Sequence, residues 1–181
     1  MAEPIISFID ANGKELTINE PLSYGTVDAG QTIAYSGNPV YIWNTYSGNP
    51  SGIPTIENCK ITTITMNPLD TDGESENTPV SSGREVIAQK WVQAKSSGYY
   101  GFSGGYPSWD PTTNYPMQSG DFQENWTAIG GTNEEDWLNI SDINPSGARS
   151  IYFQIAIPSD ATPAGSNSNI YWKTRISYTY I

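Results

Sequence analysis

The chain has 181 residues, and its 19 acidic and 8 basic residues give a formal net charge of −11 at pH 7. Such an acidic chain repels the phosphates of DNA and RNA, so we expect no nucleic-acid partner. The sequence has no histidine and a single cysteine, Cys59, which removes the usual general base of enzymes, an internal disulfide and a zinc site of paired cysteines. We therefore expect neither catalysis nor a cofactor.

The N-terminal part of the chain predicts a series of short strands. Residues 5–9 are apolar enough for a strand, residues 10–13 contain the turn-forming pair Asn-Gly, and residues 16–18 can return as the second strand of a hairpin. Residues 31–35 and 40–44 are too short, and too rich in β-branched and aromatic side chains, for helices.

The next segment combines a half-buried strand with an acidic loop. Residues 59–66 mix apolar and threonine side chains, as a strand requires, and residues 67–83 are polar and interrupted by proline and glycine, which predicts an exposed excursion. Within it Asp70, Asp72 and Glu74 alternate around a glycine and offer oxygen ligands to a calcium ion. Because no longer ligand ladder follows, we prefer a solvated acidic loop over a metal site.

The middle of the chain predicts strands followed by an unusual insertion. Residues 85–94 suggest one or two strands around Val86, Ile87, Trp91 and Val92. From about residue 96 to residue 125 glycines, prolines and aromatic residues follow one another too closely for a regular element, which predicts a long ordered loop. Aromatic residues supply large contact areas at a low entropic cost. We expect five rings of this loop to anchor a protein interface or to stack on sugars: Tyr99, Tyr100, Phe102, Tyr106 and Trp109.

The last third has the clearest strand pattern. Residues 134–136 are acidic and favour a short helical turn. Apolar Ile151, Phe153 and Ile155 alternate with other residues, and residues 170–180 alternate in the same way, which predicts two strands that each bury one face. About seven to nine strands separated by turns indicate one domain over residues 1–181, folded as an all-β antiparallel sandwich of the Ig-like kind, with a jelly roll as the alternative.

Residues 8–44, reading FIDANGKELTI, then YGTVDAGQTIAYSGNPVYIWN, resemble the opening of small Ig-like proteins attached to the particles of tailed phages. The likeness extends to residues 90–92 and to IYFQIAIPSDATPAGSNSN near the C-terminus. The resemblance implies a non-enzymatic virion protein, preferably a head decoration or cement protein that binds the major capsid protein lattice and stabilises it. A homo-oligomer around a symmetry axis is a common state of such proteins.

Two other functions remain open at this point. The chain can be a carbohydrate-binding adhesion module on a virion surface, or an accessory protein of the phage tail. The N-terminal residues lack the basic and apolar regions of a secretory signal, and no stretch approaches the roughly 18 apolar residues of a membrane span. We therefore expect assembly in the host cytoplasm and no membrane partner, and the phage resemblance implies a final place on the capsid surface.

Overall fold

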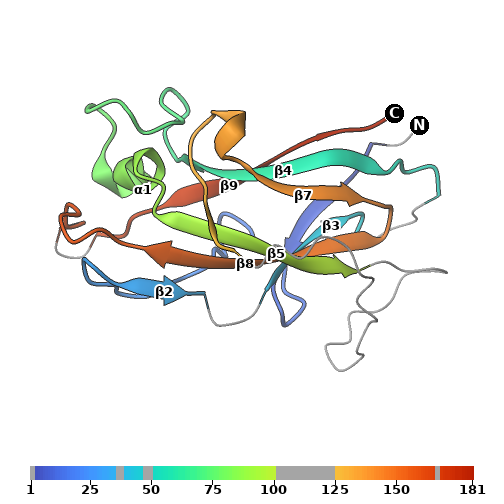
Figure 1. Ribbon diagram of the computed structural model, residues 1–181, viewed down its shortest axis with the longest axis horizontal. Coiled ribbons are helices and arrows are strands. Elements are labelled where there is room, and N and C mark those ends of the chain that lie inside the picture. The colour runs from blue at the N-terminus through green and yellow to red at the C-terminus, as the bar shows by residue number, and fades with distance from the viewer. Residues whose placement is uncertain (1–2, 36–38, 47–50, 101–124, 166–167) are drawn as a thin grey trace.

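The computed structural model describes residues 3–35, 39–46, 51–100, 125–165 and 168–181, with only the backbone described at residues 97–100. Two antiparallel sheets pack face to face (Figure 1). The larger sheet contains β1 (Ile6–Ile9), β2 (Thr32–Ala34), β3 (Val40–Asn44), β5 (Val92–Tyr100), β6 (Thr127–Ala128) and β8 (Gly147–Ala156). The smaller sheet contains β4 (Ile56–Thr65), β7 (Leu138–Ile143) and β9 (Trp172–Thr179). The predicted all-β antiparallel sandwich is confirmed.

β8 is the central strand of the larger sheet, in the order β1-β3-β8-β5-β6. β5 occupies one edge of β8, and β2 and β3 share the other edge, where Ile155 lies opposite Ile33 and Ile151 lies opposite Val40. The predicted alternation is confirmed, because Ile151, Phe153 and Ile155 are buried while the residues between them are partly exposed.

The smaller sheet has the order β7-β4-β9, so β9 forms one of its edges. β4 is threonine-rich, and its buried hydroxyls have partners: Thr62 donates to the carbonyl of Gly131 and Thr63 to the carbonyl of Ile129, at 3.1 and 3.2 Å. These bonds attach the segment after β6 to the sheet and satisfy polar groups that burial would otherwise leave unpaired.

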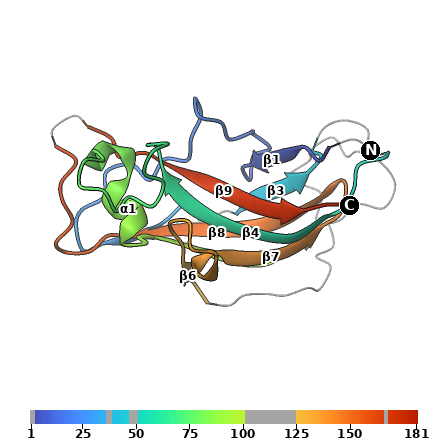
Figure 2. The same ribbon diagram turned by 90° about the horizontal axis from the view of Figure 1, so that it is seen from above.

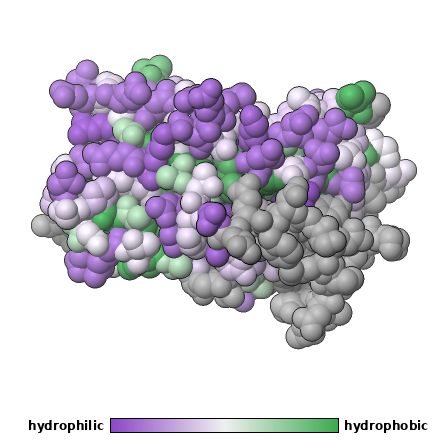
Figure 3. All heavy atoms as spheres, viewed as in Figure 1, coloured by the Kyte–Doolittle hydropathy of each residue, from purple (hydrophilic) through white to green (hydrophobic). Residues whose placement is uncertain are grey.

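One hydrophobic core fills the space between the sheets and includes side chains from both. Figure 2 shows the smaller sheet lying over the larger one. The largest fully buried side chains include Ile42, Ile61, Ile87, Leu138 and Ile151. Polar side chains cover much of the coloured part of the face shown in Figure 3, in keeping with the acidic composition.

Three local predictions need correction. The strand predicted at residues 85–94 is wrong in its first half, where α1 (Arg84–Ala88) forms and buries Val86 and Ile87. Gly83, with φ of +80°, turns the chain into this helix, and two adjacent β-branched residues fit a buried helical turn as well as a strand. β5 begins only at Val92.

In the N-terminal hairpin, the first strand and the turn are confirmed. The Asp10 carboxylate accepts hydrogen bonds from the backbone N–H groups of Asn12 and Lys14, both at 2.8 Å. The second strand is wrong, since the return segment makes only isolated bridges, one of them between Ile9 and Glu15. The turn forms as predicted, but the residues after it do not continue into a regular strand paired with β1.

The acidic excursion at residues 67–83 is only partly exposed. Leu69 is 94% exposed, but Thr78 is buried. The last part of the excursion forms the short helix η1 (Val80–Ser82). The predicted helical turn after residue 133 is confirmed as η2 (Glu134–Asp136), with the Asn133 side chain accepting from the backbone of Glu135.

Candidate functional site

A cleft of about 1420 Å³ opens between the two sheets beside β9. Its walls come from residues 16–18, 21–29, 161–165 and 168–171 and from the start of β9. Phe8 and Val40 of the larger sheet also line it. Because the smaller sheet has three strands and the larger has six, part of the larger sheet's inner face is covered by irregular chain instead of a strand.

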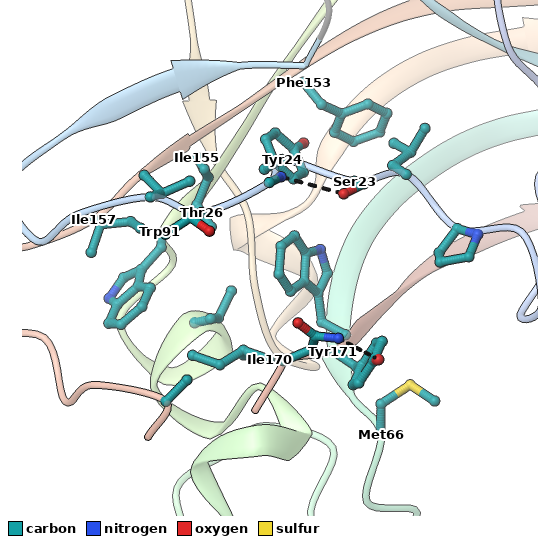
Figure 4. Close-up of a pocket in the computed structure, with 18 of the residues that line it drawn as sticks. Ser23, Tyr24, Thr26, Met66, Trp91, Phe153, Ile155, Ile157, Ile170 and Tyr171 are labelled. Atoms are coloured by element: carbon teal, nitrogen blue, oxygen red, sulfur yellow. Dashed lines mark hydrogen bonds between the residues drawn. The ribbon is translucent and has the colours of Figure 1, made fainter. Parts of the chain in front are cut away.

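Aromatic and aliphatic side chains line this cleft. Figure 4 shows Tyr24 with Phe153 and Ile155 on one side, and Ile170 and Tyr171 on the other. The Tyr24 ring lies 5.8 Å from that of Trp172 between centroids. It also meets the ring of Tyr35 edge-on, at 6.0 Å. Such contacts hold the rings in place before any ligand arrives.

Burial keeps the Tyr24 phenol neutral. Desolvation, with a smaller contribution from Tyr35, raises its pKa well above the ordinary value. The hydroxyl therefore serves as a hydrogen-bond donor or acceptor and not as an anion.

Short polar contacts hold the rim of the cleft. The backbone N–H of Gly30 donates to the carbonyl of Ile157 at 2.9 Å and fastens the wall formed by residues 24–30. On the opposite side the Asn169 amide donates to the Tyr171 hydroxyl at 3.0 Å. Among the lining residues of the described chain, Asp28 and Lys173 have formally charged side chains. The arrangement suits the binding of apolar or aromatic groups at a polar rim.

The predicted aromatic anchors lie mostly outside the described residues. Tyr99 and Tyr100 end β5, where their backbones pair with Arg149 and Ala148. Phe102, Tyr106 and Trp109 lie in the part of the chain that the structure does not describe. The role of these five rings in binding stays a prediction.

The insertion returns to the described chain near Trp126, which contacts the outer face of the larger sheet. The Lys95 ammonium group lies 4.9 Å from the centroid of the Trp126 ring and 5.7 Å from that of Tyr152. These cation–π contacts attach the end of the insertion to the body of the protein.

The candidate calcium ligands do not converge. An oxygen of Asp70 accepts hydrogen bonds from the backbone of Ser75 and the hydroxyl of Thr78. Asp72 accepts instead from the backbone and hydroxyl of Thr132, while Glu74 is exposed. Among the residues with described positions, no three acidic, cysteine or histidine side chains are grouped to hold a metal. Asp70 orders the loop itself, and Asp72 attaches it to the segment after β6.

Cys59 is fully buried in β4. Burial, followed by the nearby Asp142, raises the pKa of its thiol from 9.0 to about 12. The reactive thiolate is therefore scarce at neutral pH.

Sequence reasoning missed the cleft because its walls come from segments far apart in the chain. The motif YGTVDAG is the signal that pointed closest to it, since residues 24–29 of that motif line one wall. Nothing in the sequence placed these residues opposite residues 161–165 and 168–171, because that juxtaposition depends on the pairing of β2 with β8.

No protein family, curated protein or solved structure matches this chain. The choice between an Ig-like and a jelly-roll sandwich therefore stays a prediction. In the parts of the chain that the structure describes, every helix is too short or too polar to cross a bilayer.

Proposed function

We propose that this chain is a non-enzymatic structural protein of a phage particle, of the decoration or cement type, and that it binds the capsid lattice through the cleft beside β9. One observation carries the proposal. The segment with the phage-protein resemblance, residues 8–44, supplies one wall of the cleft beside β9, including Tyr24. The resemblance and the binding surface thus coincide in the same residues.

The physical character of the cleft supports a binding role. Trp91 and Phe153 line the cleft but are only 3% and 4% exposed, so they give it a rigid apolar floor and little contact area of their own. Buried aromatic pockets of this kind provide most of the binding energy in protein interfaces. A partner side chain that enters the cleft removes apolar surface from water at both partners.

The test is the location of the protein in purified particles. Particles from cells that encode the chain are separated on a density gradient, heads and tails are isolated, and the polypeptide is quantified in each by mass spectrometry. We expect a copy number that is a fixed multiple of the capsid symmetry, in the head fraction. Recovery in the tail fraction would favour the tail accessory function, and recovery only as free protein would refute a virion role.

A second candidate is glycan binding, which one feature of the rim favours. Tyr171 is 48% exposed beside Asn169, so a ring and an amide group lie together at the mouth of the cleft. Sugars bind to such pairs by stacking on the ring and hydrogen bonding to the amide. On a glycan array this function predicts a specific signal that Tyr171→Ala removes, whereas a decoration protein gives no signal.

A further inference from the structure

β9 has an edge without a strand partner among the described residues. It pairs with β4 on one side, and no backbone hydrogen bond between a described loop and Trp172–Thr179 is formed on the other. On an edge strand, the N–H and C=O groups of alternate residues point away from the sheet. The strand therefore presents a row of donors and acceptors to a further chain.

The cleft lies beside the start of this edge, at Trp172, Lys173 and Thr174. Trp172 and Thr174, on the inner face of β9, line it together with Val40 of the larger sheet. Tyr24 contacts Trp172 at the start of the strand, so the open part of the edge begins at Lys173. The volume of about 1420 Å³ exceeds the ~300–1,000 Å³ of sites for small molecules and suits a peptide segment better.

The outer face of β9 carries two basic residues, Lys173 and Arg175. Lys60 lies opposite Ser177, and Arg175 lies opposite Thr62, so Lys60, Lys173 and Arg175 share one face of the smaller sheet. These are three of the 8 basic residues in a chain with 19 acidic ones. Lys60 faces Glu134 at 3.9 Å, and Arg175 lies 5.4 Å from the centroid of Trp137, which leaves Lys173 the most available for a partner.

This charge pattern indicates which kind of strand can pair with the open edge of β9. Two copies of β9 pairing edge to edge would bring their lysines and arginines together on one face, which disfavours a dimer through this edge. An acidic strand gains cross-strand attraction from the same residues.

We propose that β9 captures an extended segment of a partner protein as a fourth strand of the smaller sheet. The segment carries acidic residues on its outer face, opposite Lys173 and Arg175, and apolar residues on its inner face, in the cleft. Backbone hydrogen bonds provide the attachment, and the alternating side chains provide the selectivity. This inference rests on the proposed function, because it names the partner segment that the cleft receives.

Synthetic peptides test the capture directly in the full chain. The probes are an eight-residue peptide of alternating glutamate and valine, the same peptide with lysine in place of glutamate, and a glutamate–valine peptide with the two residues in separate blocks. Tryptophan fluorescence and calorimetry follow binding. We expect the alternating acidic peptide to bind saturably, and the other two to bind at least about tenfold more weakly.

Backbone pairing is tested by N-methylation of alternate amides. Methylating one set of the peptide's N–H groups should weaken binding at least about tenfold, and methylating the other set should leave it unchanged, because only one set faces β9. Equal effects of the two sets would overturn strand addition.

Charge selectivity is tested with a matched pair of variants. Lys173→Glu should weaken the acidic peptide about tenfold and strengthen the basic one. Lys14→Glu makes the same change of net charge at an exposed lysine paired with Glu20, and should behave as the wild type. Thermal unfolding checks that both variants fold.

The outcomes separate this proposal from the virion role. Equal binding of acidic and basic peptides, or a wild-type dimer in sedimentation that the peptide dissociates, would overturn the capture of an acidic strand. Particle association without peptide binding would refute strand capture alone. Peptide binding by a protein that never enters particles would support strand capture and refute the virion role.

Discussion

Two glycines with nearly the same backbone conformation differ sharply in their surroundings. Gly83 has φ of +80° and Gly52 has φ of +79°. A Cβ atom at Gly83 would lie 2.5 Å from the carbonyl oxygen of Tyr171, whereas a Cβ atom at Gly52 would meet nothing within 4 Å. The backbone of Tyr171, next to β9, thus approaches the start of α1 as closely as a glycine permits.

The two glycine positions separate backbone strain from close packing. Gly52→Ala should lower the free energy of unfolding by about 1 kcal/mol, the cost of a left-handed conformation for a residue with a side chain. Gly83→Ala should cost at least about 2 kcal/mol more, since backbone must move to admit the methyl group. Urea denaturation measures both. Equal losses of unfolding free energy in the two variants would show that the Tyr171 backbone moves aside at no cost.

Among the elements, α1 supports the rim of the cleft through one carboxylate. An oxygen of Glu85 accepts a hydrogen bond from the backbone N–H of Thr162 at 2.9 Å. Burial opposes ionisation of this group, but hydrogen bonds from Thr162 and the charge of Arg84 outweigh it and lower its pKa below the ordinary 4.5. The helix α1, which the sequence did not predict, therefore helps to hold the wall of the cleft that contains Thr162.

The lowered pKa of Glu85 gives a pH-dependent prediction. A depressed pKa stabilises the folded state above the ordinary pKa, and this stabilisation is lost as pH falls through the folded value. Glu85→Gln should cost roughly 1 kcal/mol at pH 7, and the difference from the wild type should shrink below about pH 4.5. Chemical denaturation at several pH values measures this. Glu76→Gln, at an exposed carboxylate, is the control, and a pH-independent difference for Glu85→Gln would contradict the assignment.

The elements that could be predicted are those whose own residues decide their structure. The alternation of Ile151, Phe153 and Ile155 reports one buried face, and this signal is local, so β8 and β9 follow from it. α1 could not be predicted in this way. Its residues fit a strand equally well, and the contact between Gly83 and Tyr171, far apart in the chain, is part of what sets the choice.

The candidate site was predicted only in fragments. The cleft needs the inner face of β8, the wall of residues 24–30 and the edge of β9 at once, and no single stretch of sequence reports that meeting. The acidic loop shows the same limit. The spacing of Asp70 and Asp72 is compatible with a common ion as well as with the solvated loop that we preferred, and only the structure shows that each carboxylate has protein donors of its own.

At the scale of the whole molecule, one core joins the two sheets, so we expect them to unfold together. Tryptophan fluorescence and far-UV circular dichroism should report a single coincident transition in urea. Because an antiparallel sandwich is built from non-local pairings, refolding should take milliseconds to seconds in stopped-flow measurements. Two separate transitions would show that residues 1–181 are not one cooperative domain.

The single thiol of the chain is unreactive in the folded state, because Cys59 is buried and its pKa is raised to about 12. A cysteine introduced in place of the fully exposed Leu69 would then be the one site that takes up a maleimide dye or gold cluster at neutral pH. The Leu69→Cys variant thus accepts a single marker and keeps its native cysteine, so each labelled copy can be located by imaging.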